Sequence, residues 1–194
     1  MLRKVMCRWF RIMIAGMPLV GYLMEWNETW NVGDTLRQLE KDATEQTKVM
    51  LAAPDTGTLI INLLLVAVMP AIAEELFFRG ALQKIFIKMV KLPWLAIIIT
   101  SILFSAIHAQ FLGFMPRFVL AVLLGFIYHI GGNIWLCIIA HLLNNGLSVV
   151  LFSMGMDENA DSTPWYLALI SAVVVVALFL ILYRRNKQTE TIKL

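Results

Sequence analysis

Charged residues are scarce in this sequence: Asp, Glu, Lys and Arg make up only 15% of its 194 residues, whereas 60% are hydrophobic. An ordinary soluble domain is about a quarter charged and roughly half apolar, so the composition argues against a soluble fold. The formal net charge of +3 is small and dispersed, and therefore does not suggest a nucleic-acid partner. The mean hydropathy of +0.77 is instead typical of an integral membrane protein.

Cysteine is also scarce, and the sequence contains neither a CxxC pair, nor a Cys/His ligand spacing, nor an HExxH motif. The two cysteines, Cys7 and Cys137, both lie in apolar surroundings. We therefore expect small core residues rather than a disulfide or a cysteine metal site.

Long apolar runs are abundant, and a membrane-spanning helix needs about 20 such residues. Five runs meet this length, at 58–80, 93–112, 114–130, 133–153 and 164–183. A sixth run, at 5–24, is interrupted by two arginines. The basic N-terminus resembles the start of a signal peptide, but no small-residue cleavage pattern follows, so a short membrane or interfacial helix is preferred. The sequence predicts an all-α, polytopic transmembrane helical bundle of about six helices.

The distribution of charge divides and orients the chain. We expect an N-terminal helix with a polar segment at 1–57, a membrane core at 58–153, and a last helix with a basic tail at 154–194. Basic residues follow Arg79 and mark both ends, whereas acidic residues dominate 25–57, so both termini are predicted to be cytoplasmic. The amphipathic segment from Arg79 to Lys91 either extends the preceding helix or lies along the membrane surface.

Two adjacent glutamates and an arginine lie in the apolar run at 58–80, where charged side chains cost several kcal/mol and usually serve a function. Glu75 and Arg79 are four residues apart and face each other on a helix, whereas Glu74 points about 100° away. This geometry predicts that Arg79 pairs with Glu75 and leaves Glu74 free as a general base. Pro70, four residues before Glu74, is predicted to kink the helix beside the site.

Two further apolar runs carry polar side chains. Ser105 and His108 lie three residues apart in the run at 93–112, and His141 and Asn145 lie four apart in the run at 133–153, with Asn144 nearby. Each set could simply connect helices by hydrogen bonds.

The polar positions fall near the middle of their runs, so we expect them to converge at one depth. A carboxylate, two imidazoles and a carboxamide supply a base, a second proton-transfer group and donors to an oxyanion. This set suits attack of water on a carbonyl. A Ser105/His108 nucleophile pair remains an alternative, although the sequence around Ser105 does not resemble a nucleophile elbow.

These motifs together resemble those of the CPBP family, the CAAX-protease and bacteriocin-processing family of intramembrane endopeptidases, also called the Abi or type II CAAX prenyl endopeptidase family. The resemblance covers about residues 58–150 and rests on Glu74-Glu75-x-x-x-Arg79, Phe104-x-x-x-His108 and His141-x-x-x-Asn145. It implies an all-helical membrane protease that cleaves peptide bonds at a water-filled site within the bilayer.

The resemblance also implies roles for individual residues. Glu74 and His108 would activate the water, whereas His141 and Asn145 would stabilise the oxyanion and Glu75 would support the site. We therefore expect catalytic residues at Glu74, Glu75, His108, His141 and Asn145. Supporting residues are expected at Arg79, Phe104, Ser105 and Asn144.

Many similar proteins are described as metalloproteases, in which case Glu74, His108 and His141 would be ligands of Zn²⁺. The spacing does not decide this, and a mechanism without a metal or other cofactor is favoured. Members of the family commonly have additional helices before the first motif, whereas only residues 1–57 precede it here. Either a smaller bundle suffices or an N-terminal portion is missing.

Two other functions are compatible with the sequence. One is a non-enzymatic bacteriocin immunity or membrane scaffold protein, although such a protein would not need all of the polar residues. The other is a proton-coupled transporter, but the chain is short and contains no internal repeat. The expected partners are the lipid bilayer and a peptide or protein substrate, with a membrane-associated or lipidated substrate among the candidates. The resemblance suggests a bacterial plasma membrane, and the oligomeric state is left open.

Overall fold

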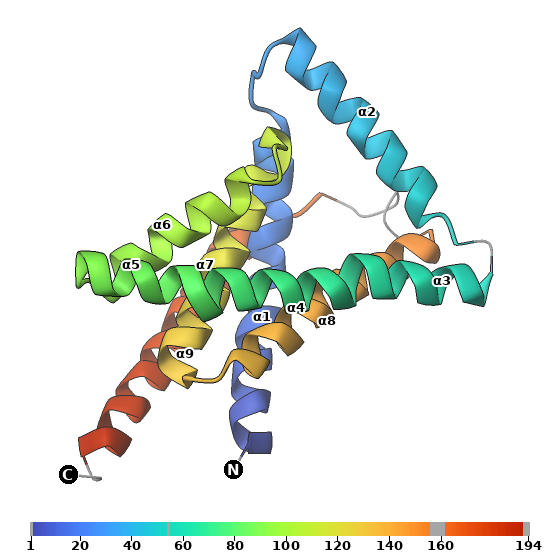
Figure 1. Cartoon of the computed structure of the whole chain (residues 1–194). Helices are drawn as coiled ribbons and strands as arrows, with labels where there is room; N and C mark the ends of the chain where they lie inside the picture. The colour runs from blue at the N-terminus through green and yellow to red at the C-terminus, as the bar shows by residue number, and fades with distance from the viewer. Residues whose placement is uncertain (1, 54, 156–161, 192–194) are drawn as a thin grey trace.

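The computed structural model describes residues 2–53, 55–155 and 162–191, with side chains for 11–53, 55–155 and 162–184. Within these ranges the chain is helical and contains no β-strand, which confirms the all-α prediction (Figure 1). The side chain of Cys7 and the acidic residues Asp157, Glu158 and Asp161 lie outside the described residues. The helices outside the first apolar run are α1 (Leu2–Glu28), α2 (Asp34–Leu51), α6 (Pro93–Ala106), η3 (Phe111–Gly113), α7 (Phe114–Gly131), α8 (Ile134–Ser153) and α9 (Trp165–Thr191).

One continuous helix of 35 residues, Thr56–Val90, crosses the bundle (Figure 1). It joins α3 (Thr56–Asn62), η1 (Leu63–Val68), α4 (Met69–Glu75), η2 (Leu76–Leu82) and α5 (Gln83–Val90). Asp55 caps its start by accepting the N–H of Thr58, and this bond lowers the pKa of the Asp55 carboxyl. The helix ends where Lys91 adopts a left-handed conformation. The segment after Arg79 therefore extends the preceding helix.

The wide turns of η1 and η2 are π-helical and flank α4, which carries the two glutamates. Pro70 lies at the start of α4 and cannot donate a backbone hydrogen bond, so the ordinary helical ladder is interrupted there. π-Helical turns are rare and occur frequently at functional sites. The predicted distortion beside Pro70 thus takes the form of wide turns.

Four described helices are long and apolar enough to span a membrane: Thr56–Val90, Phe111–Gly131, Ile134–Ser153 and Trp165–Arg184. The predicted run at 93–112 differs, because α6 has only 14 residues and ends at Ala106. A 14-residue helix is about 21 Å long, which is less than the roughly 30 Å of a hydrocarbon core. The predicted run at 5–24 forms part of α1, which is not among the four.

Helices α1 and α9 pack side by side and antiparallel (Figure 1). The Ser171 hydroxyl donates to the carbonyl of Ala15 and accepts the N–H of Leu19 at 3.2 Å, while Glu25 accepts the N–H of Thr163. The start of α1 and the end of α9 therefore lie at the same end of the pair. A buried apolar cluster, which includes Ile12, joins α1 and α9 to α7 and α8.

Close packing at Gly125 yields a test of the helix arrangement. A Cβ there would lie 2.8 Å from Ile97 Cγ2 and 3.1 Å from Gln83 Oε1, whereas at Gly146 the nearest atom would be 3.8 Å away. We expect Gly125→Ala to lower the melting temperature in detergent, because overpacking costs about 1–3 kcal/mol. Gly146→Ala gains helix propensity without a clash and should not lower it. Equal melting temperatures for the two variants would contradict the packing at Gly125.

Candidate active site

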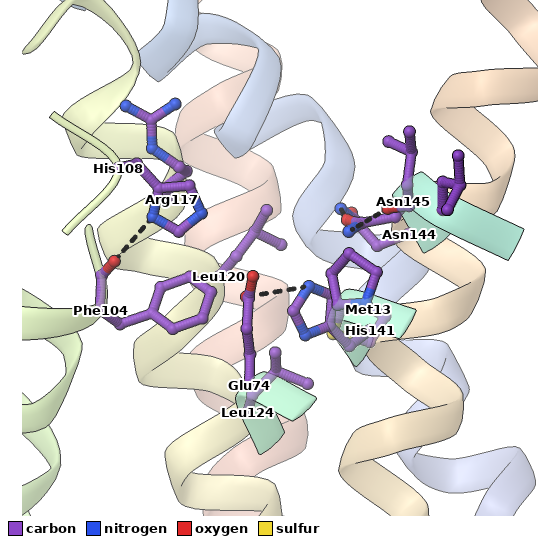
Figure 2. A pocket seen from close by; sticks show the side chains of 13 residues that line it. Met13, Glu74, Phe104, His108, Arg117, Leu120, Leu124, His141, Asn144 and Asn145 are labelled. Atoms are coloured by element: carbon purple, nitrogen blue, oxygen red, sulfur yellow. Dashed lines mark hydrogen bonds and ion pairs between the residues drawn. The ribbon is translucent and has the colours of Figure 1, made fainter. Parts of the chain in front are cut away.

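A cavity of about 400 Å³ lies where the long helix meets α7, α8 and the turn after α6. Figure 2 shows the side chains that line it, and those predicted from the sequence are Glu74, Phe104, His108, His141, Asn144 and Asn145. The rest of the lining is mainly apolar, with Met13 contributed by α1. Side chains from three separate motifs therefore meet in one cavity.

Glu75 and Arg79 form a buried ion pair beneath this cavity. Arg79 Nη1 donates to Glu75 Oε1 at 3.0 Å, and the two side chains are 2% and 0% exposed. Arg79 Nη2 also donates to the carbonyl of Ala121 at 3.0 Å, and its guanidinium lies 4.9 Å from the centre of the Phe104 ring. The predicted pair is thus present, and it connects the long helix to α7.

His141 lies between the two glutamates. Its Nδ1 is 2.9 Å from Glu75 Oε1, and its Nε2 is 3.9 Å from Glu74 Oε2 (Figure 2). Because a carboxylate oxygen only accepts, Nδ1 carries the proton, which fixes the ring orientation. Sequence reasoning missed the bond between His141 and Glu75, since the two residues are 66 positions apart.

Glu74 differs from Glu75 in its environment. Its side chain is 25% exposed and lines the cavity, whereas that of Glu75 is completely buried. The described residues offer Glu74 one ion-pair partner, His141, at the longer distance of 3.9 Å. The predicted difference in environment between the two carboxylates is therefore present in the structure.

Asn145 contacts the distorted part of the long helix. Its Nδ2 donates to the carbonyl of Val66 at 3.2 Å, and its Oδ1 accepts from Asn144 Nδ2 at 3.2 Å. Val66 lies four residues before Pro70, so its carbonyl is the one that lacks the usual donor from position 70. The carboxamide replaces that bond and still has a second N–H hydrogen.

His108 lies beyond the end of α6, which corrects the prediction that it is central in a membrane helix. Its Nδ1 donates to the carbonyl of Phe104 at 2.8 Å, and this carbonyl is one of those left without an intrahelical partner at a helix end. The bond leaves Nε2 of the neutral ring as an acceptor. Ser105 is buried, is not among the described lining residues, and donates to the carbonyl of Phe114 at 2.7 Å.

Arg117 also lines the cavity, and sequence reasoning missed it. Its Nη1 donates to Gln110 Oε1 at 3.0 Å, and its Nη2 donates to the carbonyl of the same residue. The sequence did contain a signal for it. Arg117 is a charged residue inside the apolar run at 114–130, just as Glu74 is a charged residue inside the run at 58–80.

The described side chains do not gather into a three-ligand metal site. Within the described ranges, no group of three or more His, Cys, Asp or Glu residues is close enough to hold an ion. In this structure the described side chains of Glu74, His108 and His141 are therefore not close enough together to bind one Zn²⁺ ion jointly.

Comparison with known families identifies the core of the chain. Residues 56–147 match the family model described as "Type II CAAX prenyl endopeptidase Rce1-like". Neither the curated proteins nor the solved structures contain a match to the chain. The matched segment holds all three motifs and every predicted site residue. The similarity of residues 56–147 to the type II CAAX prenyl endopeptidase family thus agrees with the resemblance drawn from the motifs.

Proposed function

We propose that this integral membrane protein is an endopeptidase that hydrolyses a peptide bond with a water molecule activated by Glu74. The observation that carries the proposal is the cavity in which Glu74, His108, His141 and Asn145 meet, although they come from distant parts of the chain. The family match independently supports a protease. A carboxylate and two imidazoles around one space suit general acid–base catalysis.

Glu74 is assigned as the base because it faces the cavity and is not paired with Arg79. Its carboxylate takes a proton from water as the water oxygen attacks the substrate carbonyl, and the proton then passes to the leaving amine. His108 presents Nε2 as a second acceptor, which can orient the attacking water. Glu75 is not assigned this role, because its side chain is completely buried and is not among the residues that line the cavity.

His141 and Asn145 are assigned as donors to the oxyanion. His141 can donate from Nε2 only with a second proton on its ring, because Nδ1 already donates to Glu75 Oε1. Its Nε2–H lies on the Glu74 side, where the tetrahedral intermediate would form. Asn145 donates through the N–H that does not bind Val66.

The family description points to a C-terminal Cys-a-a-X sequence with a prenylated cysteine as the substrate class. The cavity has apolar walls that include Met13, Leu65 and Leu120, against which the apolar side chains of such a peptide would pack. We further propose a bacterial plasma membrane as the location, with both termini cytoplasmic. The antiparallel α1 and α9 support termini on a common side.

The first test is cleavage of a farnesylated Cys-a-a-X peptide by the full chain in liposomes, followed by mass spectrometry. Glu74→Gln and His108→Ala should lower kcat by about 10²–10⁴-fold, the range of acid–base catalysis. Asn145→Ala should lower it by about 10²–10³-fold. Glu28→Gln changes an exposed carboxylate and serves as the control. Undiminished cleavage by all three site variants would overturn the assignment.

The buried ion pair predicts a different outcome for Arg79. Arg79→Ala leaves the Glu75 charge without its arginine and should destabilise the fold by about 3–5 kcal/mol, measured by thermal unfolding in detergent. Replacing both residues in Glu75→Gln/Arg79→Gln removes the unpaired charge and should recover part of that loss. Lys88→Ala, on the exposed surface of the same helix, is the control. A stable Arg79→Ala variant would contradict the structural role of the pair.

A mechanism without a metal predicts resistance to chelators. We expect cleavage to continue at an unchanged rate after prolonged incubation with 1,10-phenanthroline or EDTA. The rate should also be unaffected when Zn²⁺ is added back to the treated protein. Loss of activity on chelation and its recovery with Zn²⁺ would instead support the metalloprotease alternative.

A further inference from the structure

The turn that carries His108 is connected to the polar helix α2, far away in the sequence. Glu40 of α2 is 8% exposed, although most of its helix faces outward. Its Oε1 accepts the N–H of Phe111, and its two oxygens each lie 3.2 Å from the N–H of Leu112. These N–H groups are at the start of η3, where a helix has no internal acceptors for them. Glu40 thus holds the turn immediately after His108.

Asn27 binds the same turn from α1. This completely buried side chain donates from Nδ2 to the carbonyl of Phe111 at 2.9 Å and accepts the N–H of Met115 at Oδ1 at 2.8 Å. Gly113 allows the guanidinium of Arg117 to pack against the turn, since a Cβ there would lie 2.6 Å from Arg117 Nη1. The segment between α6 and α7 is therefore fixed by contacts from outside itself.

His108 needs such contacts more than the other candidate residues do. Glu74, His141 and Asn145 lie within helices, where the backbone fixes their positions. His108 lies between Ala106 and Phe111, outside the regular helices. The next residue, Ala109, has φ 51°, a left-handed conformation that costs a non-glycine residue about 1 kcal/mol or more. Such a conformation persists only when the surroundings impose it.

We propose that Glu40 is a positioning residue, which holds the turn so that the His108 ring faces the cavity beside Glu74. This role rests on the proposed proteolytic function. It also makes the polar segment before the first motif a part of the active site. Displacement of a catalytic group by about 1 Å can lower a rate by about 10²-fold, so anchorage of one turn is sufficient to affect catalysis.

The experiment combines a structural and a kinetic measurement on the full chain in liposomes. Glu40→Ala removes both acceptors, Glu40→Gln keeps one, and Glu45→Gln makes the same chemical change at an exposed position of α2. We expect faster amide hydrogen exchange in residues 107–115 for Glu40→Ala, a smaller increase for Glu40→Gln, and none for Glu45→Gln. With the farnesylated peptide, kcat should fall by about 10–100-fold in Glu40→Ala with little change in KM.

A double-mutant comparison shows whether Glu40 acts through His108. In a His108→Ala background, Glu40→Ala should lower the residual kcat by less than about twofold, because the group that it positions is absent. Unchanged exchange, unchanged kcat, or an equal loss in both backgrounds would each overturn the positioning role. A parent protein that cleaves no peptide would overturn the proposed function, and this is measured separately from the exchange of the turn.

Discussion

The fold is organised around the cost of burying the Glu75 carboxylate among apolar helices. An isolated charge in such surroundings costs several kcal/mol, so it persists only with partners that supply hydrogen bonds and opposite charge. Arg79 supplies both from the same helix and also binds the carbonyl of Ala121 on α7. His141 supplies a further donor from α8. One buried carboxylate thereby sets the relative positions of three helices and, through His141, the width of the space above Glu74.

A second constraint comes from Pro70, which removes one donor from the long helix. The carbonyl of Val66 then needs another partner, and Asn145 provides it. This bond places a carboxamide at the edge of the cavity, so the residue predicted to bind the oxyanion also holds a distorted helix in place. The same side chain therefore both binds the distorted helix and lines the cavity. The π-helical turns on both sides of α4 permit this arrangement without a break in the helix.

Local relationships could be predicted from the sequence, whereas contacts between distant segments could not. The pair of Glu75 and Arg79 follows from helical periodicity, and the long apolar helices follow from hydropathy. Periodicity failed at His108, because it cannot show that α6 ends at Ala106 and that an imidazole caps it. The bond between Glu75 and His141 has no local signal. Arg117 did have a local signal, because a positively charged residue in an apolar run is as unusual as a carboxylate there.

The site therefore has two kinds of support, with different consequences for function. Glu74, His141 and Asn145 lie in helices whose packing also stabilises the bundle. We therefore expect substitutions in the residues packed against them to affect stability and activity together. The segment that follows His108 is instead bound by two polar side chains, Asn27 of α1 and Glu40 of α2. If His108 acts as proposed, a change in this segment would alter activity while the bundle remains folded. Under the proposed role of Glu40, the polar helix α2 is a determinant of activity, although the hydropathy of the chain assigns it only to a connecting segment.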